Sequence, residues 1–195
     1  MALKTGIIVG STRQGRMGER VARWVEQRVK LRPALSTTWI DVAEWTFAPY
    51  PHAQPTKMAE KSYADPRERA WVELVAAQDA FIIVTPEYNH GYPAGLKNAL
   101  DYTYAGWNKK PVAFVSYGGP SGGVRAVQQL RQVAVELQMA PLRDEVNLPF
   151  VFRALDDAGV PKDEHHHKRA EAMLDELVWW GNALAAARAQ AQAAG

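Results

Sequence analysis

The chain has 195 residues, of which 47% are apolar, and it contains no cysteine. This length and composition indicate one globular domain over 1–195 with a sizeable core. A formal net charge of +2 gives no reason to expect nucleic acid as a partner. The lack of cysteine excludes disulfides, thiol catalysis and a cysteine-held iron–sulfur cluster. The sequence shows neither a signal peptide nor an apolar run long enough to span a membrane, so we expect a cytoplasmic protein without a membrane partner.

The first candidate site follows the first strand. Ile7–Val9 is a β-branched run typical of a buried strand, and residues 10–18 (GSTRQGRMG) form a loop before a helix with an apolar face of Val21, Trp24, Val25 and Val29. Free amides and the helix dipole favour a phosphate at such a helix start. The spacing matches neither the GxGxxG fingerprint nor a Walker loop, which argues against a conventional dinucleotide or triphosphate site. The alternative is a plain turn of small residues. The candidate binding residues are Ser11, Arg13, Arg16, Met17 and Gly18.

The most informative stretch covers residues 81–104. Phe81–Val84 is typical of a strand buried on both faces, and Thr85-Pro86 is expected to end it because proline has no N–H for a ladder. A loop rich in aromatic and amide side chains follows, and then a helix over 94–104 with Leu96, Ala99, Leu100 and Thr103 on one face. Open α/β sheets bind ligands at such strand–loop–helix junctions. The candidate binding residues are Pro86, Glu87, Tyr88 and Asn89.

A third candidate loop follows the strand predicted at 111–116. Four of the seven residues in 117–123 are glycine, which indicates sharp bending or close approach to a flat group. Taken alone this is a weak signal, because glycine-rich turns have many uses. The candidate binding residues are Ser116, Tyr117, Gly118, Gly119, Gly122 and Gly123.

The remaining segments complete an alternating pattern. A second strand is predicted at 37–42, a helix at 66–77 capped by Asp65, an amphipathic helix from Val124 to Leu137 and a polar fifth strand at 142–148. Residues 43–63 contain three prolines and are expected to be irregular, as a lid or a contact surface.

The chain after Pro161 is predicted to be helical. The expected buried side is Met173, Leu174, Leu177, Val178, Trp180 and Leu184. His165–His167 cannot converge on one ion from a single helix, so we expect no metal site. The alanine- and glutamine-rich end is expected to fray or to pack on a neighbouring subunit, which would leave 183–195 as a tail.

One motif resembles a known family. The run PEYNHGYPAGLKNALDY, at 86–102, is similar to the signature loop and helix of NADPH-dependent FMN reductases, flavodoxin-like enzymes that include azo-dye and quinone reductases. The resemblance extends from the first strand to about Pro149. It implies FMN as cofactor, with loop 10–18 on its phosphate and loops 86–93 and 117–123 on its ring.

The resemblance also implies an activity. Hydride would pass from NADPH or NADH to bound FMN and then to a small acceptor, so no side chain is assigned a catalytic role. Backbone N–H groups of 87–89 and 118–119 are expected to face the ring. Tyr88, Tyr92 and Tyr117 are candidates to wall the ring or to stack with nicotinamide, and the alternative is that they are ordinary packing aromatics. A homodimer or homotetramer is implied, with Trp45, Tyr92, Tyr102, Tyr104 and Trp107 as candidate interface aromatics.

Strands near 3–9, 37–42, 80–84, 111–116 and 142–147 alternate with helices. The predicted fold is therefore α/β, a flavodoxin-like doubly wound parallel sheet of five strands in the order 2-1-3-4-5 with helices on both faces. The three candidate loops would then meet at the switch between the first and third strands.

Two other functions share this fold and cofactor. One is a flavodoxin-type electron carrier to protein partners, and the other is a non-redox FMN-binding module. Carriers tend to be strongly acidic so that they dock on basic partners, whereas this chain is nearly neutral. The charge balance therefore favours the enzyme. The sequence leaves open the physiological acceptor, the preference between NADPH and NADH, and the choice between dimer and tetramer.

Overall fold

The computed structural model describes residues 2–45 and 47–193. Their helices and strands are β1 (Leu3–Val9), α1 (Gly18–Lys30), β2 (Leu35–Asp41), η1 (Val42–Glu44), α2 (Thr56–Ala59), α3 (Pro66–Ala76), β3 (Ala80–Pro86), α4 (Ala94–Asp101), η2 (Ala105–Trp107), β4 (Pro111–Tyr117), α5 (Val124–Glu136), β5 (Ala140–Pro141), β6 (Val146–Leu148), α6 (Val151–Ala154) and α7 (Glu164–Ala193).

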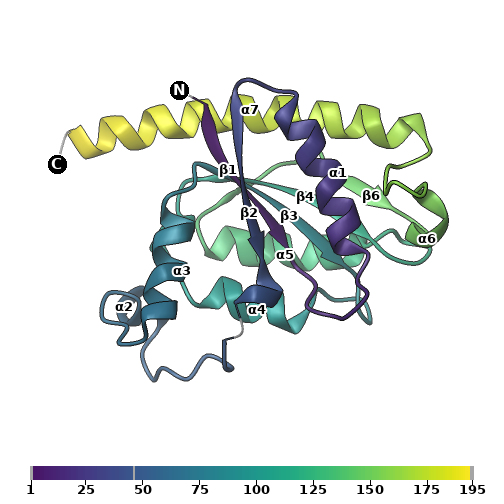
Figure 1. Ribbon diagram of the computed structural model, residues 1–195. Coiled ribbons are helices and arrows are strands. Elements are labelled where there is room, and N and C mark those ends of the chain that lie inside the picture. The colour runs from purple at the N-terminus through teal and green to yellow at the C-terminus, as the bar shows by residue number, and fades with distance from the viewer. Residues whose placement is uncertain (1, 46, 194–195) are drawn as a thin grey trace.

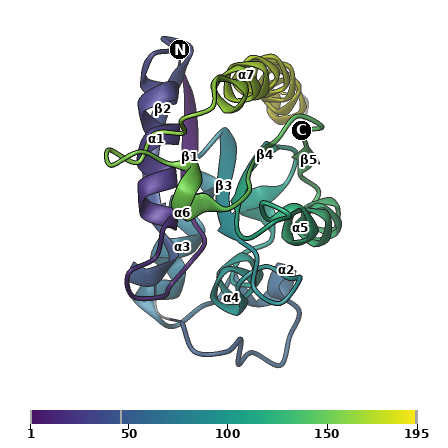
Figure 2. The same cartoon turned by 90° about the vertical axis from the view of Figure 1, so that its right-hand side faces the viewer.

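The core is a parallel sheet with helices on both faces (Figures 1 and 2). The strand order is β2-β1-β3-β4-β5, with β6 also paired to β4, which confirms the predicted order. Alternate residues of β3 supply the two faces: Ile82 and Val84 pack with α1 and α7, and Phe81 and Ile83 pack with α3, α4 and α5. Burial on both faces is why this strand is apolar throughout.

Strand β3 runs two residues further than expected, to Pro86. Pro86 pairs in register with Tyr117 of β4, and the ladder continues with the Glu87 N–H donating to the Tyr117 carbonyl at 3.2 Å. On the other side β1 has already ended, since its last pair is Val9 with Val84. The missing proline N–H therefore leaves no partner unpaired, which is why the strand tolerates it.

Of the fifth strand expected at 142–148, only 146–148 is a strand, β6, and the short β5 precedes the expected range. The carbonyls of Leu142 and Arg143, between β5 and β6, accept hydrogen bonds from the guanidinium of Arg131 on α5. The Leu142 amide still donates to the Val112 carbonyl of β4 at 2.9 Å, so the Arg131 side chain engages only the carbonyls of this segment.

Segment 43–63 is not wholly irregular, because it contains α2 and it packs on α4. Phe47 stacks on Tyr102 with ring centroids 4.2 Å apart, and Asn98 donates to the Ala48 carbonyl at 2.9 Å. Tyr102 and Trp107, expected as interface aromatics, are buried in the core instead. Trp45, Tyr92 and Tyr104 are half-buried.

Helix α4 ends at Asp101, three residues before the expected end. Beyond it, the carboxylate of Glu60 accepts from the Thr103 hydroxyl and the Tyr104 amide at 2.7 Å each, and from the Ala105 amide at 3.0 Å. An acceptor that captures these amides competes with further helical bonds and turns the chain into η2.

The C-terminal helix α7 continues to Ala193, so residues 183–193 are helical and not frayed. Arg188 holds this part by donating to Asp79 at 3.0 Å and to the Lys109 carbonyl at 2.7 Å. Residues 194–195 lie outside the described part of the chain. Trp180, expected to be buried, is 37% exposed, because its face of the helix turns away from the sheet.

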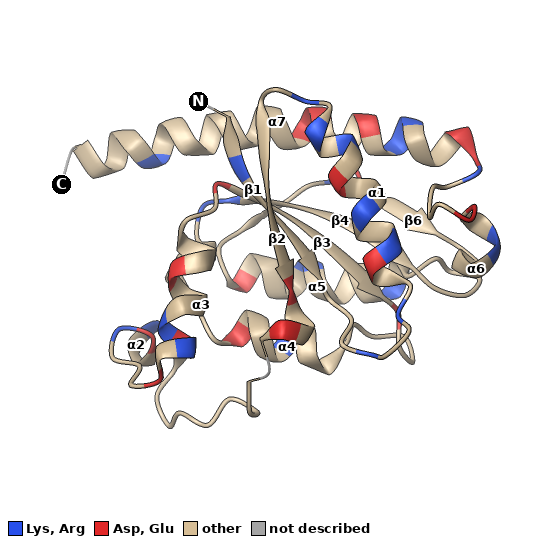
Figure 3. Ribbon diagram, in the orientation of Figure 1, with Lys and Arg blue, Asp and Glu red and all other residues tan. Residues whose placement is uncertain are grey.

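Some basic residues near the N-terminus form ion pairs with α7. Helix α1 and the facing part of α7 carry charges of both signs (Figure 3), and Arg28 and Arg32 both pair with Glu171 across the two helices. Asp65 caps α3 by accepting from the Arg67 amide at 2.7 Å, as predicted. No helix among the described residues is both long enough and apolar enough to cross a membrane.

We predict that Glu60→Ala destabilises the protein by about 2–3 kcal/mol, because it leaves three buried or half-buried donors without their acceptor. Urea unfolding should give a lower midpoint for this variant than for the parent. The neighbouring exposed Lys61→Ala is the control and should leave the midpoint unchanged. Equal midpoints for all three proteins would contradict the role of Glu60.

Candidate functional site

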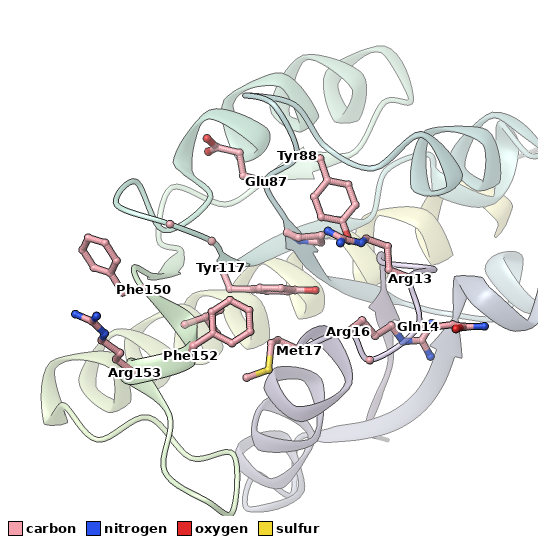
Figure 4. Close-up of a pocket in the computed structure, with 15 residues that line it drawn as sticks. Arg13, Gln14, Arg16, Met17, Glu87, Tyr88, Tyr117, Phe150, Phe152 and Arg153 are labelled. Carbon is pink, nitrogen blue, oxygen red and sulfur yellow. The ribbon is translucent and has the colours of Figure 1, made fainter.

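A pocket of about 450 Å³ lies at the carboxyl ends of β1, β3 and β4 (Figure 4). Four segments line it: 13–17 after β1, 86–88 after β3, 117–119 after β4 and 150–153 around the start of α6. Parallel strands end at one edge of the sheet, so the loops that follow them meet there.

The loop after β1 uses its two arginines differently. Arg16 is ion-paired with the buried carboxylate of Asp41 and donates to the Ser11 carbonyl at 2.7 Å. Arg13 lies over the ring of Tyr88, 5.2 Å from its centroid, and has no carboxylate partner among the described residues. Arg13 is therefore a cation of this loop that a bound anion can recruit, whereas Arg16 is already engaged in holding the loop.

The loop after β3 turns tightly at Tyr88–Gly91. Tyr88 and Gly91 exchange two backbone hydrogen bonds, of 2.8 and 3.0 Å, and the two residues between them have positive φ, 50° at Asn89 and 67° at His90. This is the two-residue turn that favours asparagine at its first position. Asn89 therefore shapes the turn, and it does not line the pocket.

The two loops are joined by a short polar contact. The Ser11 hydroxyl, which is fully buried, lies 2.7 Å from the hydroxyl of Tyr88. Ser11 does not reach the pocket surface. It therefore orients Tyr88, which does line the pocket.

The glycine loop is supported from behind by Ser116. The Ser116 hydroxyl donates to the Gly122 carbonyl at 2.7 Å and accepts from the Asn147 amide at 2.9 Å. Gly122 and Gly123 have φ of 60° and 91°, and a Cβ on Gly123 would lie 2.6 Å from the Cβ of Ser116. Both glycines are thus required by the turn itself, while Gly118 and Gly119 face the pocket.

Three of the amides expected to face the ring are already paired. The Glu87 N–H donates to the Tyr117 carbonyl, the Tyr88 N–H to the Gly91 carbonyl and the Gly118 N–H to the Leu148 carbonyl. The expectation is wrong for these three, because the sheet edge and the turn use their donors. For Asn89 and Gly119 it stays a prediction.

Tyr117 lines the pocket, and its hydroxyl oxygen is buried from solvent. Its side chain is 5% exposed, and the hydroxyl approaches Ser11 and the Gly18 backbone without forming a hydrogen bond. Loss of solvent raises the pKa of this phenol above its ordinary value, so it remains a neutral donor. A Cβ at Gly18 would lie 2.4 Å from the hydroxyl, which explains the glycine there.

The structure adds residues that the sequence patterns missed. Phe150 and Phe152 line the pocket although they are 54% and 81% exposed. The Phe150 amide donates to Gly119 at 3.0 Å and the Val151 amide to Gly118 at 3.2 Å, which fastens this segment to the glycine loop. The only signal for segment 150–153 in the sequence was its position, because it follows a strand that ends at the same edge of the sheet. The residues missed are Gln14, Gly15, Phe150, Val151, Phe152 and Arg153.

The pocket thus gathers most, but not all, of the candidates. Those that line it are Arg13, Arg16, Met17, Pro86, Glu87, Tyr88, Tyr117, Gly118 and Gly119. Those that support its loops from outside are Ser11, Gly18, Asn89, Ser116, Gly122 and Gly123. Tyr92 lines a separate hollow with Phe47 and Pro49, so its role toward the ring or the nicotinamide stays a prediction.

The arrangement suits a planar group that carries an anionic tail. Figure 4 shows Tyr117, Phe152 and Met17 toward one end of the pocket and Arg13 and Arg16 toward the other. The Arg13 guanidinium, which has no carboxylate partner among the described residues, is a donor for a phosphorylated ligand. These residues fit FMN. Among the described residues, no group of three or more histidine or carboxylate side chains is placed to hold a metal.

Comparison with known proteins agrees with this geometry. The chain is 36% identical to an NAD(P)H-dependent FMN reductase of Nectria, over 90% of this chain and 91% of that protein. It is 30% identical to an NAD(P)H:quinone oxidoreductase of Solanum tuberosum, over 71% and 74%. Its fold matches FerB, a flavoenzyme NAD(P)H:(acceptor) oxidoreductase of Paracoccus denitrificans, with a TM-score of 0.73, 21% identity and coverage of 93% and 98%.

The sequence match to a family is broader than any single motif. Residues 3–153 match the family described as NADPH-dependent FMN reductase, a range that takes in all four segments lining the pocket. The chain therefore belongs to the NADPH-dependent FMN reductase family, and it is an oxidoreductase.

Proposed function

We propose that this protein uses the pocket between its strand-end loops to bind FMN, and that it transfers hydride from NADPH or NADH through the flavin to a small acceptor. The observation that carries the proposal is the meeting at one cavity of an arginine without a carboxylate partner among the described residues, two tyrosine rings and two glycines. Family membership supports the same cofactor and co-substrate.

The residues divide the work of binding. Arg13 would pair with the phosphate. Pro86, Tyr88, Gly118 and Gly119 would form the walls on either side of the ring. Bound FMN supplies the redox chemistry by accepting hydride and passing electrons on.

The acceptor we propose is a small flavin, quinone or azo compound. The support is the quinone oxidoreductase named among the relatives, together with exposed Phe150 and Phe152, which offer aromatic surface at the pocket.

We also propose that the chain is one domain and that the protein is cytoplasmic. Fractionation that recovers it with membranes or in an exported fraction would contradict this location.

Arg13→Ala should weaken FMN binding by about 1.5–3 kcal/mol, because a charge-assisted hydrogen bond to the phosphate is lost. Riboflavin, which lacks the phosphate, should bind the variant and the parent equally in a fluorescence titration. An equal loss of FMN and riboflavin affinity in Arg13→Ala would show that Arg13 acts through structure.

Arg16→Ala should act differently: it leaves the buried Asp41 carboxylate without its ion-pair partner, at a cost on the order of 3 kcal/mol in unfolding free energy.

Excess NADPH or NADH, without another reductant, should bleach the visible absorbance of the bound flavin in anaerobic stopped flow. An added quinone or azo dye should restore it, and steady-state double-reciprocal plots should be parallel, as for alternating half-reactions. The carrier alternative expects a flavin that stays oxidised under nucleotide but accepts electrons from dithionite. A flavin inert to both reductants would identify a non-redox module.

We also propose a homodimer or homotetramer. The support is the set of large apolar side chains left exposed on the described surface, among them Trp179 at 62% and Phe152. Light scattering at micromolar concentration with FMN present should give a multiple of the mass of one chain. The mass of a single chain would refute the proposal.

A further inference from the structure

A buried carboxylate connects two loops of the pocket. The Glu87 side chain is only 6% exposed, and it belongs to the loop after β3. It accepts from the Arg125 side chain at 2.6 Å through Nε, from the Arg125 backbone amide at 3.1 Å and from the Ser121 hydroxyl at 3.2 Å. All of these donors come from the glycine loop or from the first turn of α5 that follows it.

The three side chains form a closed set of contacts. Arg125 also donates to the Ser121 hydroxyl at 2.8 Å, so each member touches the other two. Burial by itself raises the pKa of the Glu87 carboxyl, but the hydrogen bonds from Arg125 and Ser121 outweigh burial and lower the pKa below its ordinary value. The carboxylate is therefore ionised at neutral pH and its charge is matched.

The same helix holds the loop at a second point. One turn further along α5, the side-chain amide of Gln129 donates to the His90 carbonyl at 2.9 Å. His90 lies in the tight turn with positive φ, a conformation that needs support from its surroundings. Helix α5 thus contacts the loop after β3 at both its start and its tip.

These contacts have a consequence for the width of the pocket. Pro86–Tyr88 and Tyr117–Gly119 line it from two different strand ends, and past the end of the sheet ladder each loop is free to move unless something joins them. The Glu87 carboxylate is bonded by side chains of the other loop's continuation, at 121 and 125. Beyond the backbone bond from Glu87 to the Tyr117 carbonyl, this ion pair is therefore a side-chain link between the two walls.

We propose that Arg125 is a positioning residue which, through Glu87 and Ser121, fixes the spacing of the two loops that bind the flavin ring. This inference rests on the proposed function. It distinguishes two kinds of arginine at one site: Arg13 would recognise the phosphate, whereas Arg125 would recognise no part of the ligand and would set the gap for the ring. Loss of Arg125 should therefore affect every ligand that carries the ring, with or without a phosphate.

The experiment compares Arg125→Gln, Arg125→Lys and the control Arg28→Gln. Arg28 also pairs with a glutamate, Glu171, but does so between α1 and α7 away from the pocket. Fluorescence titrations of apoprotein should show FMN and riboflavin both binding about tenfold more weakly to Arg125→Gln, with partial recovery in Arg125→Lys. Arg28→Gln should bind both flavins like the parent, even where urea unfolding shows a comparable loss of stability. Unchanged affinity of Arg125→Gln for both flavins, or a loss confined to FMN, would overturn the inference.

Hydrogen exchange on the apoproteins provides a second readout that needs no ligand. Arg125→Gln should speed the exchange of amides in 88–91 and 118–123 together, and leave exchange in the strands unchanged. Exchange equal to that of the parent in both loops would overturn the inference whatever the flavin affinities are. A parent protein that binds neither flavin would refute the proposed function instead, and exchange would still decide whether Arg125 joins the loops.

Discussion

The parallel pairing of β1, β3 and β4 is the constraint on which the site depends. β1 ends at Val9 opposite Val84, and β4 ends at Tyr117 opposite Pro86, so three loops leave the sheet at nearly the same level. Pro86 is tolerated there because no strand remains on its β1 side to receive a donor. The Glu87 amide then extends the ladder by one bond and brings the signature loop against the glycine loop. The pocket is a direct result of this shared edge.

Most of the polar chemistry around the pocket holds loops and does not face the ligand. Arg16 is taken by Asp41, the Ser116 hydroxyl by Gly122, and the Glu87 carboxylate by Arg125 and Ser121. The groups left for a ligand among the described lining residues are the Arg13 and Arg153 guanidinium groups, the Gln14 side chain and aromatic or peptide surface. This division suits flavin chemistry, because the cofactor performs the reaction and the protein has mainly to hold it in one orientation.

The face of the sheet that packs with α3, α4 and α5 has a structural role. Segment 43–63 contributes aromatic rings that pack on Tyr102 and Trp71, and the buried Glu60 fastens it to the chain after α4. This aromatic cluster supports α4, the helix that follows the signature loop. The loop is thus supported from two sides, by the aromatic packing behind α4 and by the contacts from α5.

Local pattern alone determined the kind and order of the main elements, because periodicity in β3, α1 and α5 reports directly which side chains face a core. It also located three of the four segments that line the pocket, since turn-forming residues after apolar strands mark the ligand edge of a parallel sheet. Only the tertiary structure decided which side chains in those loops are free. Arg13 and Arg16 are three residues apart and chemically identical, and the difference between them is Asp41, which lies on another strand. The sequence likewise does not reveal that the backbone amides of Glu87, Tyr88 and Gly118 are paired, because the fold sets their partners. Segment 150–153 joins the pocket through backbone bonds to Gly118 and Gly119, which no side-chain pattern encodes. The physical reason is the same in each case: a hydrogen-bonding group is available to a ligand only if no distant part of the chain reaches it first.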